Sequence, residues 1–193
     1  ETSKAKESYD DFLKEAFEAR PGSGGLIFLP YLQGERSPMW DARARGAFIG
    51  IHSEHERKHF MRAVIEGICY SLYNTVSIME KPKTPISTVY VSGGFTRSTE
   101  WVRMLCDLFD IRTKVSGKGD ASSIGAVFMG MRALKMIDSW KETSRYLEIS
   151  ATYRPRKRER DVYRRNYEVF SRMYGLLKPT MHRIADWQDA GHR

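Results

Sequence analysis

Cysteine is scarce in this sequence of 193 residues, in which only Cys69 and Cys106 are present. Each falls on the apolar face of a predicted helix, where a free thiol behaves as a small hydrophobic side chain. We therefore expect both cysteines to be reduced and unpaired, as is usual in the cytosol. Neither is expected to carry chemistry.

Long apolar runs are also lacking. No stretch approaches the roughly 20 consecutive apolar residues that a membrane-spanning helix requires, and residues 1–4 lack the pattern of a signal peptide. We therefore expect a cytoplasmic protein with no membrane association. The length suits one domain with a sizeable core, or part of a larger two-domain protein.

Acidic residues are fewer than basic ones. The sequence contains 24 Asp and Glu and 32 Lys and Arg, which gives a net charge of +8. Residues 151–193 hold 11 Lys and Arg but only 5 Asp and Glu, so most of the excess lies in this tail. The tail also predicts a helix with an aromatic stripe, formed by Tyr163, Tyr167, Phe170, Tyr174 and Leu177. A basic face opposite a buried stripe is typical of a solvated helix surface. A basic nucleic-acid-binding module is therefore the alternative function, not the preferred one.

A short histidine motif raises the question of zinc. His55, Glu56 and His59 match the H-E-x-x-H pattern, in which two histidines one helical turn apart bind zinc and the glutamate activates water. Arg57 and Lys58 lie between them, however, and two cations would oppose a dication in a partly desolvated site. We therefore expect a solvated helix start and no metal site.

The centre of the chain predicts a compact β-α-β-α unit, because strand-like and helix-like patterns alternate there. Its elements are expected at residues 88–91, 98–109, 112–115 and 121–134. Such alternation implies parallel strands, and parallel sheets bind ligands beyond the carboxyl ends of their strands. Gly93 and Gly94 follow the first strand at such an end. Paired glycines let a backbone approach a ligand, and the next helix would direct N–H groups at nucleotide phosphate. A plain tight turn is the alternative.

The remaining pattern predicts further helices and strands. They are expected at residues 5–19 (helix), 26–29 (strand), 46–51 (strand) and 54–79 (helix), with an irregular, polar segment at 31–45. In the helix at 121–134, the small residues Gly125, Ala126 and Gly130 predict close approach of a neighbouring backbone or ligand.

Taken together, these residues resemble the C-terminal domain of the FGGY family of carbohydrate kinases. Residues 46–66 fit the second signature of that family at each specified position, namely Gly46, Phe48, Gly50, Ile51, His59, Phe60, Ala63, Val64, Ile65 and Glu66. The loop at 34–41 is most similar to gluconate kinases and the xylulose-kinase group. Residues 91–98 look like the family's adenosine motif, and residues 122–126 resemble the hinge helix of ATPases of the actin type.

The resemblance covers the chain from Gly24 to about Leu177 and implies a fold. This fold is the α/β, ribonuclease-H-like (actin-like ATPase) C-terminal domain of a sugar kinase, here lacking its first strands. Three segments are then expected: an N-terminal helix at 1–20, an ATPase-type core at 21–150 and a basic, aromatic helical tail at 151–193. Only two strands are expected to belong to the central parallel sheet.

The resemblance also implies an ATP-dependent kinase that phosphorylates a hydroxyl of a sugar or sugar acid, of gluconate or xylulose type, with Mg²⁺. The implied cofactor-binding residues are Gly93, Gly94, Phe95 and Ser98. In this arrangement the glycines face the α-phosphate and ribose, and Ser98 contacts the base. The implied hinge residues are Ser122, Gly125 and Ala126, and the implied cleft-loop residues are Glu35 and Arg36.

The same resemblance implies that the catalytic base, the magnesium ligands and a Gly-Thr phosphate loop come from outside this stretch, mostly from an N-terminal domain. No Gly-Thr-Ser or Gly-Thr-Thr occurs in the sequence. We therefore expect the chain to be inactive by itself. Its expected partners are the sugar substrate and that N-terminal domain, with a homodimer left open and no nucleic acid or membrane.

Overall fold

The computed structural model describes residues 8–79, 85–117 and 121–191. The chain forms two compact units, one of Glu1–Thr84 with Arg156–Arg193 and the other of Pro85–Pro155. This division differs from the expected segments 1–20, 21–150 and 151–193. The reason is that the C-terminal helix returns to pack on the first strand and on the long helix of the first unit.

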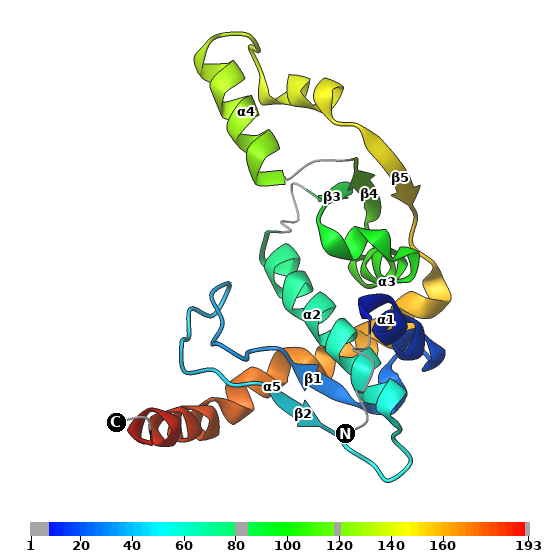
Figure 1. The fold of residues 1–193 in the computed structure, drawn as a ribbon, viewed down its shortest axis with the longest axis vertical. Helices are drawn as coiled ribbons and strands as arrows, with labels where there is room; N and C mark the ends of the chain where they lie inside the picture. The colour runs from blue at the N-terminus through cyan, green and yellow to red at the C-terminus, as the bar shows by residue number, and fades with distance from the viewer. Residues whose placement is uncertain (1–7, 80–84, 118–120, 192–193) are drawn as a thin grey trace, which may run out of the picture. The chain divides into compact units, whose positions relative to one another are not determined.

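The first unit combines a two-stranded antiparallel sheet with three helices (Figure 1). Its elements are α1 (Tyr9–Glu18), η1 (Ser23–Gly25), β1 (Ile27–Leu29), β2 (Ala47–Ile49), α2 (Arg57–Met79) and α5 (Lys157–Ala190). A capping box, in which Ser8 and Asp11 each accept from the other's backbone N–H, fixes the start of α1. The predicted strands and helices are present, although α2 begins three residues later than expected, and residues 5–7 of the first predicted helix lie outside the described residues.

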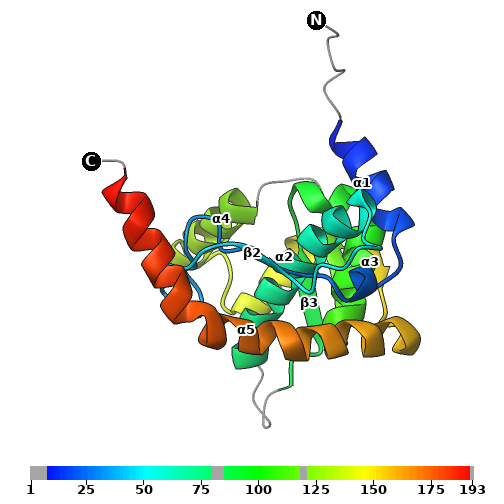
Figure 2. The ribbon, with the colours of Figure 1, turned by 90° about the horizontal axis from the view of Figure 1, so that it is seen from below.

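The core of the first unit lies between β1, α2 and α5. Leu26, Phe28 and Ala63 form a buried cluster, against which Phe60 and Val64 pack. The predicted aromatic stripe of α5 is confirmed, since Tyr163 and Phe170 are fully buried and Phe170 contacts Tyr31, with 6.3 Å between the ring centroids. The basic residues of this helix occupy its outer faces. Figure 2 shows that α5 bends along its length, and Pro179 lies inside the helix, where proline removes a backbone hydrogen bond.

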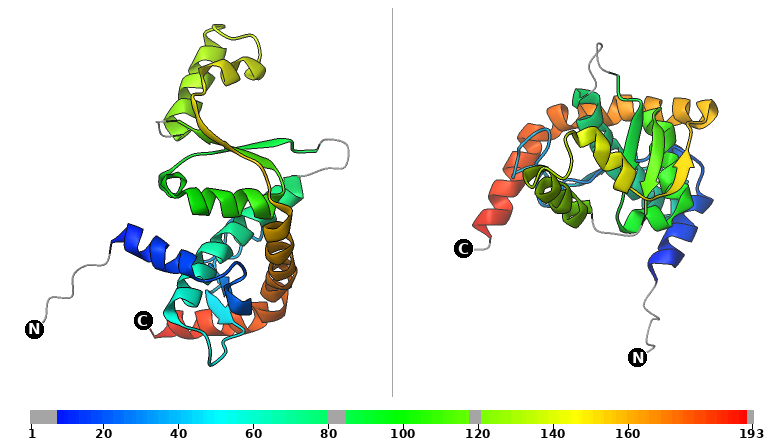
Figure 3. Two further views of the ribbon diagram at one scale, coloured as in Figure 1. Left: turned by 90° about the vertical axis from the view of Figure 1, so that its right-hand side faces the viewer. Right: turned by 90° about the horizontal axis from the view of Figure 1, so that it is seen from above.

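The second unit is built on a three-stranded sheet of order β3-β4-β5. Its elements are β3 (Thr88–Val91), η2 (Gly94–Arg97), α3 (Thr99–Phe109), β4 (Arg112–Ser116), α4 (Ala121–Ala133), η3 (Trp140–Tyr146) and β5 (Ile149–Tyr153). β3 and β4 pair in parallel, which confirms the predicted β-α-β-α unit. Figure 3 shows α3 lying along one face of this sheet.

One strand of the second unit was not predicted. β5 pairs antiparallel with β4, with a register irregularity at Val115 and Ser116, so the sheet is mixed and not purely parallel. Its five residues alternate between half-buried and exposed, as is usual for a strand at the edge of a sheet.

α4 differs from expectation in its packing. It was predicted to press its small residues against a neighbour, but Cβ atoms added at Gly125 and Gly130 would meet nothing within 4 Å. Val127 and Met129 are exposed too, by 59% and 68%, whereas Phe128 faces Tyr146 with 6.4 Å between the ring centroids. Within the described residues, therefore, no neighbour packs on Gly125 or Gly130, and close packing of these small residues stays a prediction. Figure 3 shows α4 standing off the three-stranded sheet.

Two further expectations concern the thiols and the membrane. Cys69 and Cys106 are buried and form no disulfide. Among the residues described, no helix combines the length and the apolar character that crossing a membrane demands.

Candidate functional site

The backbone turn after β3 is the first component of the candidate site. Gly93 follows the carboxyl end of the strand with φ +102°, a conformation that residues with a Cβ rarely adopt. Added Cβ atoms would meet nothing within 4 Å at Gly93 and only the tip of the Arg97 side chain, at 3.9 Å, at Gly94. Both glycines are exposed. The turn is therefore an open stretch of backbone that leaves room for a ligand.

The segment after the glycines differs in detail from the prediction. α3 does not follow directly, because the 3₁₀ turn η2 intervenes. Within it the Thr96 N–H donates to the Gly93 carbonyl at 3.1 Å, and the Ser98 N–H donates to the Phe95 carbonyl at 3.0 Å. Ser98 accepts a hydrogen bond from the Trp101 N–H (3.2 Å) and so caps α3, and it is only 8% exposed. Phe95 packs on Trp101, with 5.8 Å between centroids. Ser98 and Phe95 thus hold the turn in place.

A cavity of about 210 Å³ lies beside this turn, at the carboxyl ends of β3 and β4. Its lining is mostly apolar with two serine hydroxyls, and consists of Tyr90, Val91, Ser92, Ser116, Ile124, Gly125, Phe128 and Leu147. The predicted hinge residue Gly125 therefore contributes to a wall of the cavity, whereas Ser122 and Ala126 are exposed outside it. An apolar cavity with few polar groups at this edge is the usual setting for a ligand in an α/β sheet.

The predicted cleft-loop residues lie in the first unit, in a hairpin that we call the cleft loop (residues 34–41). Its base is closed by two backbone hydrogen bonds between Glu35 and Asp41, at 2.9 and 2.8 Å. Gly34 has φ +78°, and a Cβ there would lie 2.7 Å from the Ala42 Cα, so only glycine fits. Glu35 also accepts from the Ser71 hydroxyl on α2 (3.2 Å). Arg36, by contrast, is exposed in the segment beyond this base, residues 36–40, which we call the tip; there its carbonyl accepts from the Trp40 N–H at 2.9 Å.

Asp41 is a buried acceptor at the base of the cleft loop, which sequence reasoning missed. One carboxylate oxygen accepts from the Tyr174 hydroxyl and from His182 Nε2, both at 2.7 Å, and the other accepts from the Arg43 N–H at 2.9 Å. Burial alone would raise the pKa of Asp41. The hydrogen bonds from Tyr174, His182 and Arg43 together outweigh burial and hold the pKa well below its usual range.

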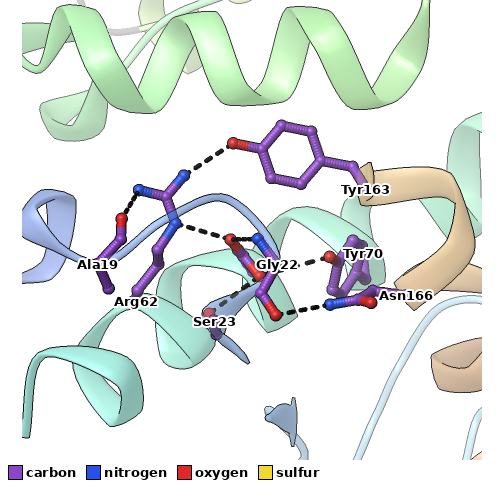
Figure 4. A network of polar contacts seen from close by, with 8 residues as sticks. Ala19, Gly22, Ser23, Arg62, Tyr70, Tyr163 and Asn166 are labelled. Carbon is purple, nitrogen blue, oxygen red and sulfur yellow. Dashed lines mark hydrogen bonds and ion pairs between the residues drawn. The ribbon is translucent and has the colours of Figure 1, made fainter. Parts of the chain in front are cut away.

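A second buried network surrounds Glu66, the last position of the signature match (Figure 4). One of its oxygens accepts from Arg62 Nε (2.8 Å) and the Gly22 N–H (2.9 Å), and the other accepts from the Ser23 hydroxyl (3.0 Å). Burial raises the pKa of Glu66, and Arg62 beside it opposes that shift. Arg62 also donates to the Ala19 carbonyl and the Tyr163 hydroxyl. The network therefore ties α2 to α5 and to the chain between α1 and β1, and it is structural.

The histidine motif does not form a zinc-binding helix. α2 begins at Arg57, so His55 lies before the helix, and its Nε2 is 3.2 Å from the Gly24 carbonyl. His59 Nδ1 accepts from the Glu56 N–H at 3.0 Å. Within the described residues, no three His, Cys, Asp or Glu side chains gather to hold a metal ion.

Comparisons with curated proteins give two groups of relatives. The chain is 35% identical over 181 residues to the gluconokinase of Bacillus subtilis, covering 93% of this chain and 35% of that protein. It is 34% identical over 175 residues to a xylulose kinase of Staphylococcus epidermidis, covering 89% of this chain and 35% of that protein. The chain therefore spans about a third of the length of the curated relatives that it matches.

Comparisons with solved structures agree. The chain matches ligand-bound xylulose kinase from Lactobacillus acidophilus with a TM-score of 0.84 and 30% identity, over 92% of this chain and 36% of that one. Gluconate kinase from the same organism gives a TM-score of 0.82 and 31% identity, with the same coverage. A family model described as "FGGY family of carbohydrate kinases, C-terminal domain" matches residues 1–134. The chain thus belongs to the FGGY family of carbohydrate kinases, and it corresponds to the C-terminal domain of these proteins.

Proposed function

We propose that the intact protein is an ATP-dependent carbohydrate kinase and that this chain supplies its nucleotide side. The observation that carries the proposal is the turn at Gly93 and Gly94, an exposed backbone at the carboxyl end of β3 with open space around it. The family membership supplies the reaction class. The alternative of a nucleic-acid-binding module has no support from these findings.

The residues of the turn fit a nucleotide. We assign the phosphate and ribose side to Gly93 and Gly94, where no side chain hinders approach, and the adenosine side to the segment from Phe95 to Ser98. Bound ATP would supply the γ-phosphoryl group for transfer to a substrate hydroxyl. The chain's own contribution is to bind and orient the nucleotide, and such positioning accounts for much of the rate of phosphoryl transfer.

The substrate that we propose is a sugar or sugar acid of xylulose or gluconate type, because both names occur among the relatives at 34–35% identity. Glu35 and Arg36 would belong to the wall of the substrate cleft. The catalytic base and the ligands of Mg²⁺ are assigned to the rest of the intact protein, since this chain spans about 35% of its relatives. A homodimer and a cytosolic setting remain predictions, the latter supported by the buried thiols of Cys69 and Cys106.

We propose α4 as part of the hinge between this domain and the remainder of the protein. Ser122, Gly125 and Ala126 lie on its first two turns, are exposed, and offer a narrow surface for a covering segment. Val127 and Met129 of this helix are exposed as well, which supports a surface that another part of the protein covers.

The test is Gly94→Val in the intact protein. The branched side chain would occupy the space through which the phosphates approach, so the KM for ATP should rise about tenfold, which is ~1.4 kcal/mol, while the KM for the sugar changes little. Gly175→Val on α5 is the matched control, because a Cβ there also meets nothing within 4 Å. Unchanged ATP kinetics in Gly94→Val would refute the assignment of this turn.

A further inference from the structure

The base of the cleft loop is held rigidly. Glu35 and Asp41 exchange backbone hydrogen bonds across it, and Gly34 sits where a Cβ would collide with the backbone of Ala42. These contacts fix the two strands of the hairpin against each other, independently of its tip.

The same two carboxylates tie the loop to different helices. Glu35 accepts from Ser71 on α2, and Asp41 accepts from Tyr174 and His182 on α5. Tyr174 and His182 are eight residues apart, about two helical turns, so they lie on one face of α5. Asp41 is 9% exposed, and its carboxylate accepts three hydrogen bonds in all. The buried Asp41 side chain therefore ties the cleft loop to α5.

The tip of the loop has a different character. Trp40 is 80% exposed, and its φ of +50° is uncommon for a residue with a large side chain. Arg36 is exposed as well. A strained backbone that holds an aromatic and a cationic side chain out to solvent, above a fixed base, is suited to presenting them to a ligand.

We infer that Asp41, Tyr174 and His182 are positioning residues for sugar binding, which hold the cleft loop so that its tip meets the substrate. This inference rests on the proposed kinase function and extends it, because it assigns α5 a role in substrate affinity. None of the three residues is expected to touch the sugar or the nucleotide. They act through Arg36 and Trp40.

The ionisation states suit this arrangement at neutral pH. The pKa of Asp41 lies well below its usual range, so the side chain is an ionised acceptor. Burial, followed by the hydrogen bond to Asp41, raises the pKa of Tyr174 to about 12, so its hydroxyl stays protonated and able to donate.

The experiment is steady-state kinetics of the intact protein with Asp41→Asn and Tyr174→Phe. Tyr174→Phe removes the hydroxyl that donates to Asp41, and Asp41→Asn removes the charge and one of the two acceptor oxygens, each with little change of volume. We expect the KM for the sugar to rise about five- to tenfold, with the KM for ATP within about twofold of wild type. Trp40→Ala should raise the sugar KM in the same direction, because it removes part of the tip itself.

Tyr167→Phe is the matched control. The Tyr167 hydroxyl donates to Asn74 Oδ1 at 2.8 Å, so it also ties α5 to α2, but it does not touch the cleft loop. It should shift the melting temperature about as much as Tyr174→Phe and leave both KM values unchanged. An equal rise of the sugar KM in Tyr167→Phe, or none in Tyr174→Phe and Asp41→Asn, would overturn the inference. If wild-type protein transfers no phosphoryl group to any sugar, the proposed function itself fails.

Discussion

The glycines in the middle turns of α2 and α4 have opposite surroundings. In α2, Gly67 is buried, and a Cβ there would collide with the carbonyl oxygen of Phe28 on β1. In α4, Gly125 and Gly130 face open space. Within the described residues, a helix glycine thus marks a close approach at Gly67 but not at Gly125 or Gly130.

The polar groups of the two units show a related contrast. In the first unit, Glu66 and Asp41 are buried, and each accepts hydrogen bonds from several donors. In the second, the turn at Gly93 and Gly94 and most of α4 are exposed. The difference indicates that the first unit is stabilised internally, whereas the exposed backbone of the second is available for a ligand or for the rest of the protein.

The largest effect should come from the buried network. Glu66→Gln removes the carboxylate beside buried Arg62 and leaves that charge without its counter-ion, which should cost about 3–5 kcal/mol of the free energy of unfolding. Glu15→Gln is the control, since Glu15 pairs with Arg57 at 2.7 Å on the surface and should cost at most about 1 kcal/mol. Denaturant unfolding measures the free energy of unfolding of both variants. Similar losses in the two would mean that the buried Glu66 network stabilises the fold no more than a surface ion pair does.

A smaller effect is expected at the glycine of α2. Gly67→Ala would force α2 and β1 apart, at a cost of about 1–3 kcal/mol despite the better helix propensity of alanine. Thermal melting of the intact protein measures the loss. A variant as stable as wild type would show that β1 can move to make room for the methyl group. The contrast between Gly67 and the exposed glycines of α4 would then have no effect on stability.

The smallest effect has the opposite sign. Gly130→Ala, outside the proposed hinge residues, places a methyl group in open space on a helix, so alanine's propensity should raise the free energy of unfolding by about 0.5–1 kcal/mol. A loss of stability instead would show that a segment of the intact protein packs closely on α4 at this position. That outcome would restore the packing that the sequence first predicted.

Much of the fold was predictable, because local patterns determine it. The β-α-β-α unit, the position of Gly93 and Gly94 after β3 and the buried stripe of α5 all follow from hydrophobic periodicity and glycine placement. β5 was missed because its exposed positions, Ser150 and Thr152, resemble a loop and no turn signal precedes it.

The polar networks could not be predicted in the same way. Arg62 and Glu66 are four residues apart on a helix, a spacing that usually marks a surface ion pair. Here the chain between α1 and β1 and the returning α5 both contact the pair and bury it. Asp41 meets Tyr174 and His182 across more than 130 residues of sequence. A single sequence carries no local signal for contacts of that range.

The central claim is that nucleotide binds to the second unit at the turn after β3. Amide hydrogen exchange of the intact protein, with and without a non-hydrolysable ATP analogue and Mg²⁺, tests it most directly. We predict that the analogue slows exchange in residues 92–98 and in the first turns of α4. We predict no change in exchange around Arg62 and Glu66, because their hydrogen-bond network is already formed without nucleotide. Protection confined to the first unit, with residues 92–98 unchanged, would contradict the account.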